Sequence, residues 1–149
     1  MKKMKLVMVG NGMAGVRTLE ELLKIAPDLY DITVFGAEPH PNYNRILLSP
    51  VLAGEQTIDE IILNPLSWYE ENGITLHTGR KVTSVDRRRR IVRAENPDGS
   101  STEAEYDRLL IATGSNPFIL PVPGKDLHGV IAYRDIADTN FMIETAKTH

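Results

Sequence analysis

The sequence predicts an α/β fold built on a parallel sheet, and three observations support this class. A short apolar run at residues 5–9 is interrupted by glycines and followed by a segment with helical spacing. A second run, at residues 31–35, is rich in β-branched and aromatic side chains. A third run, at residues 109–112, ends in small residues. Such runs are typical of strands that are covered on both faces, so we expect a doubly wound, three-layer domain over residues 1–149.

The first part of the chain is predicted to alternate strands and helices. Apolar residues at positions 16, 19, 23 and 26 recur at steps of three and four, which is the pattern of an amphipathic helix. Residues 36–44 hold two prolines and two asparagines and predict a loop. Residues 45–54, RILLSPVLAG, predict a short helix.

A further helix is expected where asparagine and proline stand together. Asn64 is the expected N-cap, Pro65 takes the first helical position, and Gly73 ends the helix. The segments at 74–79 and 81–86 then predict two strands.

The region from Arg87 to Tyr106 predicts a polar β-hairpin, because NPDG at 96–99 is a strong turn signal. The run of four arginines at 87–90 is interpreted as a solvated strand edge that resists pairing, rather than as a phosphate-binding patch. Residues 130–133, VIAY, predict a short strand, and the chain closes with a predicted helix.

Composition excludes several classes of function. The 17 basic and 20 acidic side chains give a formal charge of −3, so no overall attraction to nucleic acid or to an anionic membrane is expected. The absence of cysteine removes disulfides, thiolate metal sites and thiol nucleophiles. No run approaches the roughly 20 apolar residues of a membrane span, and the apolar stretch after the first lysines is too short for a signal peptide. We therefore expect a cytoplasmic protein.

No catalytic or metal-binding residue is predicted. The four histidines are His40, His77, His128 and His149. They are far apart in sequence and lack metal-ligand spacing. The adjacent glutamates at 20–21 and 70–71 are expected on helix surfaces, so neither pair is assigned general acid–base chemistry. The aromatic pair at 68–69 is assigned to helix packing.

The glycines that interrupt the first apolar run carry the strongest functional signal. Gly10, Gly12 and Gly15 form G-x-G-x-x-G between a predicted strand and a predicted helix. In this arrangement the first glycine makes a tight turn, the second lets the backbone approach a pyrophosphate, and the third lets helix and strand pack closely. The N–H groups of the first helical turn then face the phosphates.

Two further features agree with a dinucleotide site. Glu38 follows the second strand, where an acid is expected to accept hydrogen bonds from ribose hydroxyls. Residues 112–114, Ala-Thr-Gly, follow another strand at the edge where open α/β sheets bind ligands. These features do not separate NAD from FAD, because both contain adenosine pyrophosphate.

The sequence also resembles a known family. RLLIATGS at 108–115, GNGMAG at 10–15 and the polar hairpin resemble the FAD-binding part of flavoprotein reductases with two dinucleotide-binding domains. Within that family, GNGMAGVRTLEELL, YNRILLSPVLAG and WYEENGI resemble the N-terminal region of the large subunit of assimilatory NAD(P)H-dependent nitrite reductases. Pro50 stands where the ferredoxin-reductase branch has a lysine, which favours the nitrite reductase branch.

The resemblance assigns FAD contacts to individual residues. These are Gly10, Gly12, Met13, Ala14 and Gly15 at the pyrophosphate, Glu38 at the adenosine ribose, Arg45, the Val82 backbone beside adenine, Ala112, Thr113, Gly114 and Arg134. Arg45 suits this role chemically, because a guanidinium offers five donors to a pyrophosphate. The resemblance implies a Rossmann-like FAD-binding domain.

The implied chemistry belongs to the flavin, which accepts two electrons from NAD(P)H and passes them to a downstream centre. In the resembled nitrite reductases these centres are a [4Fe–4S] cluster and sirohaem, both expected outside this chain. No second glycine fingerprint for NAD(P) follows Gly15. We therefore expect a truncated part of a larger, discontinuous flavoprotein that is inactive alone, binds FAD weakly and self-associates through uncovered apolar surface.

Three alternatives remain open at this point. A ferredoxin-reductase-type flavoprotein shares the features around Arg45. A fragment of an NAD-binding dehydrogenase shares the glycine fingerprint, although it needs a catalytic residue that the sequence does not offer. A non-catalytic module that senses nucleotides needs only the fingerprint.

Overall fold

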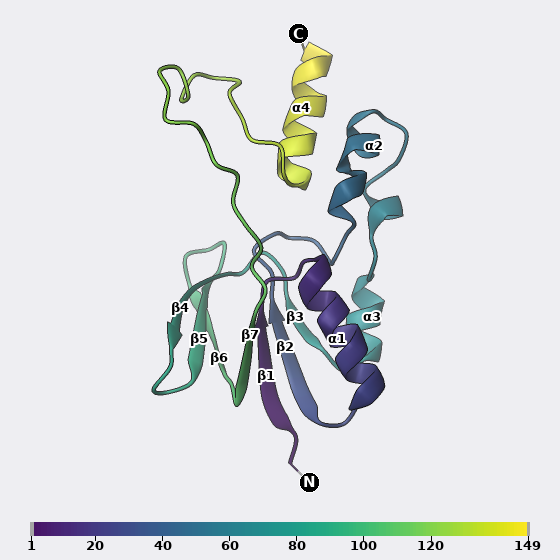
Figure 1. Cartoon of the computed structure of the whole chain (residues 1–149), viewed down its shortest axis with the longest axis vertical. Helices are drawn as coiled ribbons and strands as arrows, with labels where there is room; N and C mark the ends of the chain where they lie inside the picture. Colours follow the sequence, from purple (N-terminus) through teal and green to yellow (C-terminus); the bar gives the residue numbers. More distant parts are fainter. Residues whose placement is uncertain (1, 149) are drawn as a thin grey trace. The chain divides into compact units, whose positions relative to one another are not determined.

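The computed structural model describes residues 2–148 and divides the chain into two compact units (Figure 1). The first unit comprises the residues up to Tyr43 together with Leu63–Gly114. The second comprises Asn44–Ile62 and the residues from Ser115 onward. Assignment of residues 1–149 to one FAD-binding domain stays a prediction.

A four-stranded parallel sheet forms the centre of the first unit (Figure 1). Its strands are β1 (Met4–Val9), β2 (Tyr30–Phe35), β3 (Thr75–His77) and β7 (Arg108–Ile111), in the order β3-β2-β1-β7. The central strand β1 pairs with β2 along its whole length, from Met4 opposite Tyr30 to Val9 opposite Phe35. Because β1 has neighbours on both edges and a layer on each face, its residues 6–9 are all buried. The predicted parallel sheet is confirmed.

Helices cover one face of this sheet. Helix α1 (Met13–Ile25) and helix α3 (Leu66–Glu71) contribute Val16, Leu19 and Tyr69 to a buried cluster. From the sheet, Met8 and Val34 join it. Each of these five side chains is at most 1% exposed. The amphipathic helix expected from the apolar spacing is therefore confirmed.

A three-stranded antiparallel meander covers the other face. It consists of β4 (Lys81–Asp86), β5 (Ile91–Glu95) and β6 (Ser101–Glu105) in sequential order. Val92 and Ala94 of β5 are fully buried in a cluster with Val7 and Phe35, whereas Arg93 between them faces solvent. The fold has three layers, as predicted, and one covering layer is a sheet.

Three local predictions are corrected in this unit. Arg87–Arg90 form the exposed turn between β4 and β5, not an edge strand, because Asp86 Oδ1 accepts from the backbone N–H groups of Arg88 and Arg89 at 3.0 and 2.9 Å. Asn64 does not cap α3, since Pro65 is its N-cap residue. The strand β7 lies at a sheet edge, so Ile111 is 65% exposed rather than buried.

The second unit is built around two helices. A 3₁₀ turn, η1 (Arg45–Leu47), leads into α2 (Leu48–Leu52), which contacts α4 (Ile136–Thr148). A further 3₁₀ turn, η2 (Asp59–Ile61), completes the first segment. Asn44 Oδ1 accepts a hydrogen bond from Ile46 N–H at 3.1 Å and caps η1, where the predicted short helix begins.

The segment between β7 and α4 is irregular. Residues 130–133 do not form the predicted strand. Many large apolar side chains in this segment are exposed: Phe118, Ile119, Leu120, Val122, Leu127, Val130, Ile131 and Tyr133. At its end, Asp135 Oδ1 accepts from Asp138 N–H at 2.8 Å and caps α4. Asp138 Oδ2 accepts in turn from the N–H groups of Arg134 and Asp135.

The second unit's first segment is inserted into the first unit at a single point. The carbonyl of Asn42 accepts from Leu63 N–H at 2.9 Å, so the chain leaves and re-enters the first unit at adjacent residues. Within the second unit, Asn44 N–H donates to the Ile61 carbonyl at 2.8 Å. Over residues 2–148, the structure holds no helix with the length and apolar character needed to cross a bilayer.

Candidate dinucleotide-binding site

The ends of the parallel strands meet at one edge of the sheet and bring the predicted site residues of the first unit together. The N–H of Gly10, after β1, donates to the Phe35 carbonyl at 2.8 Å. The N–H of Ala112, after β7, donates to the Val9 carbonyl at 2.8 Å. These bonds continue the sheet pairing by one residue and fix the start of the glycine loop.

Gly10 occupies a position that requires glycine. Its φ of +101° lies in a region that L side chains rarely adopt. A Cβ atom on Gly10 would lie 2.1 Å from the carbonyl oxygen of Ala112. The tight turn expected from the fingerprint is present, and it depends on close contact with the end of β7.

Gly12 is the N-cap residue of α1 and lies beside open space. A Cβ on Gly12 would meet no atom within 4 Å, and no side chain caps this helix end within the described chain. The first N–H groups of a helix have no acceptor within the helix, which applies here to Met13, Ala14 and Gly15. A bare backbone surface with free donors at a helix N-terminus fits a phosphate group.

Gly15 lets α1 approach the sheet. A Cβ on Gly15 would lie 2.9 Å from Met8 Sδ and 3.0 Å from Ala112 Cβ, which is closer than packing allows. The three glycines therefore serve three different needs: a turn, an open backbone and a close helix–strand contact.

Two backbone hydrogen bonds extend the pairing of β2 beyond its last residue, and Glu38 lies just after this extension. Gly36 N–H donates to the His77 carbonyl at 2.9 Å, and Arg80 N–H donates back to Gly36 at 2.8 Å. The Glu38 carboxylate accepts from the hydroxyl of the buried Tyr43 at 2.6 Å. Glu38 therefore lies beyond the carboxyl ends of the central strands with its side chain held by Tyr43.

Val82 and the residues after β7 also lie in the first unit. Val82 is half-buried in β4 and packs on the cluster that contains Val7 and Val9. Thr113 and Gly114 are exposed, and Gly114 has a φ of +71°. The backbone of this segment is thus open to solvent.

Arg45 and Arg134 belong to the second unit, where the structure brings them together. Arg45 Nη1 donates to the Arg134 carbonyl at 3.0 Å. Arg134 N–H donates to Asp138 Oδ2 at 2.8 Å. The two predicted arginines are neighbours although they are 89 positions apart along the chain.

The structure describes three of the four histidines. No group of three or more His, Cys, Asp or Glu side chains within residues 2–148 is placed to hold a metal ion. His77 stacks on Phe35 with ring centroids 4.8 Å apart, and burial, followed by the charge of Arg80, lowers its pKa. His149 lies outside the described residues.

Sequence reasoning missed two polar residues next to the glycine loop. Asn11, between Gly10 and Gly12, accepts a hydrogen bond from the Tyr69 hydroxyl at 2.8 Å. The sequence signal for Asn11 was its polar side chain between two glycines of the fingerprint. Tyr69 was assigned to helix packing alone.

Comparison with known proteins agrees with this geometry. A family model described as pyridine nucleotide-disulphide oxidoreductase matches residues 4–148. The chain belongs to the pyridine nucleotide-disulphide oxidoreductase family. Its relatives in this family are oxidoreductases. The resemblance found in the sequence, including the nitrite reductase branch, is confirmed.

Two relatives of this family member come from Bacillus subtilis. One is named nitrite reductase [NAD(P)H] and is 53% identical over all of the chain, which covers 18% of that protein. The other is named assimilatory nitrate reductase electron transfer subunit and is 48% identical over 99% of the chain, again 18% of the relative. The chain therefore spans about a fifth of the length of these relatives.

A solved structure shows the same fold. The NADH:rubredoxin oxidoreductase of Clostridium acetobutylicum superposes with a TM-score of 0.81 and 27% identity, covering 99% of this family member and 36% of that protein.

Proposed function

We propose that this chain is the FAD-binding part of an NAD(P)H-dependent flavoprotein oxidoreductase of the nitrite reductase type. The observation that carries the proposal is the open backbone at Gly12. Among the described residues, no atom lies within 4 Å of a Cβ placed there, and no side chain caps the first-turn N–H groups of α1. The residues present fit the diphosphate of a dinucleotide.

Each site residue has a chemical role in this proposal. The N–H groups of Met13, Ala14 and Gly15 donate to the diphosphate, assisted by the helix dipole. Glu38, oriented by Tyr43, accepts from the ribose hydroxyls. The Val82 backbone lies beside adenine.

The resemblance assigns the remaining contacts. Ala112, Thr113 and Gly114 supply backbone groups after β7, and Arg45 and Arg134 supply positive charge.

The bound flavin supplies two-electron chemistry with NAD(P)H, while the protein supplies position and electrostatics. The chain holds no cysteine, so a dithiol mechanism has no residues here. The relative named nitrite reductase [NAD(P)H] favours nitrite as the final acceptor in the full-length enzyme. The resemblance to nitrite reductases implies a [4Fe–4S] cluster and sirohaem in other parts of that polypeptide.

A second acceptor is favoured by one observation. The relative named assimilatory nitrate reductase electron transfer subunit is 48% identical, close to the 53% of the nitrite reductase. In this alternative the same FAD site delivers electrons to a nitrate reductase. Both versions use the glycine loop in the same way.

An NMR titration tests the proposal. In ¹H–¹⁵N spectra of the 149-residue protein, FAD is expected to shift the amides of Gly12, Met13, Ala14 and Gly15 most strongly. ADP contains the adenosine diphosphate half and is expected to reproduce these shifts, whereas FMN is not. If FAD and ADP leave these amides unchanged, the site does not bind a dinucleotide.

A further inference from the structure

A chain of hydrogen bonds connects the glycine loop to helix α3. Asn11 Oδ1 accepts from the Tyr69 hydroxyl at 2.8 Å, and the Tyr69 oxygen accepts from Asn42 N–H at 3.2 Å. Tyr69 is 1% exposed. Its hydroxyl thus joins the residue between the two loop glycines to the end of the 36–44 loop.

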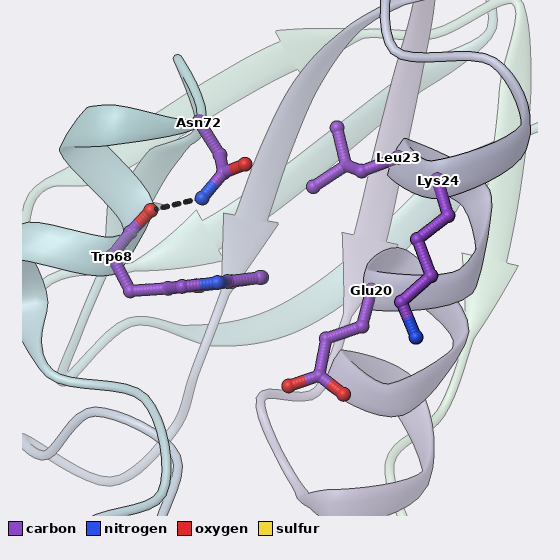
Figure 2. Close-up of a pocket in the computed structure, with 5 residues that line it drawn as sticks. All are labelled: Glu20, Leu23, Lys24, Trp68 and Asn72. Carbon is purple, nitrogen blue, oxygen red and sulfur yellow. Dashed lines mark hydrogen bonds between the residues drawn. The ribbon is translucent and has the colours of Figure 1, made fainter.

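The hydrogen bonds continue from Asn42 to helix α1. Asn42 Nδ2 donates to Asn64 Oδ1 at 2.8 Å, and Asn64 Nδ2 donates to Glu20 Oε1 at 2.9 Å. Glu20 lies on α1 at an open groove of about 480 Å³, where the side chain of Trp68 extends from α3 toward α1 (Figure 2). This series, Asn11–Tyr69–Asn42–Asn64–Glu20, is called the asparagine network below.

Core packing alone does not explain the asparagine network. A phenylalanine at position 69 fills the same space without a hydroxyl that needs partners. Asn42 Oδ1 is buried without a hydrogen-bond partner among the described residues. The asparagine network therefore forms although it leaves one buried acceptor unsatisfied. Burial also raises the pKa of the Tyr69 hydroxyl, which keeps it protonated as the donor to Asn11.

The surroundings of Asn11 are shaped to hold its side chain toward Tyr69. A Cβ at Gly36 would lie 3.0 Å from Asn11 Cβ, so the absence of a side chain at Gly36 makes room for Asn11. The backbone of Asn11 joins Gly10, which is fixed to β2 and β7, to Gly12, which is open. Asn11 is therefore the point at which a bond from α3 can set the conformation of the open half of the loop.

We infer that Tyr69 is a positioning residue for the dinucleotide: acting through Asn11, it holds the Gly10–Gly12 backbone so that the first-turn amides of α1 stay aligned on the diphosphate. This inference rests on the proposed function. Helix α3 supplies no proposed FAD contact. Through Tyr69 it nevertheless contributes to FAD affinity.

A double-mutant cycle on FAD binding tests the inference. Tyr69→Phe keeps the ring and removes the hydroxyl, and Asn11→Ala removes its acceptor. The dissociation constant is measured from the amide shifts in an FAD titration of the 149-residue protein. Each single substitution is expected to raise it about 3- to 10-fold, the range of one lost hydrogen bond. The double substitution is expected to raise it no further than the larger single effect, because both remove the same bond.

Tyr30→Phe is the matched control. Tyr30 packs on the same buried cluster as Tyr69 but stands at the first position of β2, at the opposite end of the sheet from the loop. Its substitution is expected to leave the dissociation constant within about twofold. Thermal unfolding of all variants shows that they are folded during the titration.

The outcomes separate the two levels of the argument. A Tyr69→Phe protein that unfolds at lower temperature but binds FAD as tightly as the unsubstituted chain overturns the inference, because Tyr69 then serves the core only. Additive losses in the double substitution overturn it as well. If the unsubstituted chain itself does not bind FAD, the proposed function fails and the inference with it.

Discussion

The β1–α1 region and the 115–135 segment use apolar residues in opposite ways. In β1 and α1 the apolar side chains of Met8, Val16 and Leu19 are fully buried, and the glycines that separate the two elements have defined steric roles. Between β7 and α4, side chains such as Phe118 and Leu127 are 80% and 67% exposed, and no regular element forms. The first region buries its apolar side chains in the core of the first unit, whereas the second leaves much of its apolar surface exposed.

The largest effect is expected at Gly10. Gly10→Ala places a Cβ 2.1 Å from the Ala112 carbonyl at a φ of +101°, so the β1–α1 turn and the end of β7 must separate. We expect a loss of about 3 kcal/mol or more in the free energy of unfolding, measured by urea denaturation. A loss below about 1 kcal/mol would show that the turn does not determine the stability of this region.

Gly12→Ala is expected to separate binding from stability in the same loop. The added methyl group meets no protein atom within 4 Å, so the cost in unfolding free energy is expected below about 1 kcal/mol. It occupies the space proposed for the diphosphate, and we expect the FAD dissociation constant to rise about tenfold or more, equal to ~1.4 kcal/mol. Equal FAD affinities of the two proteins would mean that the open space is not the binding surface.

The exposed segment is expected to affect association rather than folding. Replacing Phe118, Leu120 and Leu127 by serine changes side chains that are 80%, 62% and 67% exposed, so each is expected to alter the unfolding free energy by no more than about 0.5 kcal/mol. The unsubstituted chain is expected to self-associate through this surface, and the triple variant to be monomeric by light scattering. A monomeric unsubstituted chain would contradict this expectation.

The smallest effect is expected from pH. Burial, followed by the charge of Arg80, lowers the pKa of His77 below its ordinary value of 6.5. As the pH falls through 6.5 the unfolded chain takes up the proton first, so this contribution to stability is present above pH 6.5 and lost below it. His77→Phe retains an aromatic ring against Phe35. Between pH 7 and pH 5, the unfolding free energy of this variant is expected to fall less than that of the unsubstituted chain. Parallel pH profiles of the two proteins would rule out this role.

The glycine fingerprint and the layers around it were predictable because their sequence patterns are local. The steric reason for glycine at residue 10 is the distant end of β7, and at residue 15 it is Met8 together with Ala112. The spacing of Val16, Leu19 and Leu23 places one helix face on the sheet whatever the rest of the chain does. Such features are visible in a single sequence.

Two of the misses depend on distant segments, and one depends on a local contact that was overlooked. Asn64 looked like a helix cap, but its amide lies in the asparagine network with Asn42 and Glu20, 22 and 44 positions away. The arginine run turned out to be a turn because the Asp86 carboxylate, directly before it, accepts two backbone N–H groups. Residues 130–133 have strand composition but find no strand to pair with. In each case the residue types were read correctly, but the contact that decides the structure was not identified.

The single exit and re-entry point at Asn42 and Leu63 has a consequence for insertions and deletions. Because the Asn42 carbonyl and the Leu63 N–H already close the gap at 2.9 Å, residues 44–62 are expected to tolerate changes in length without altering the path of the first unit. The parallel sheet and its glycine loop are therefore expected to keep their geometry when this insertion is shortened or enlarged.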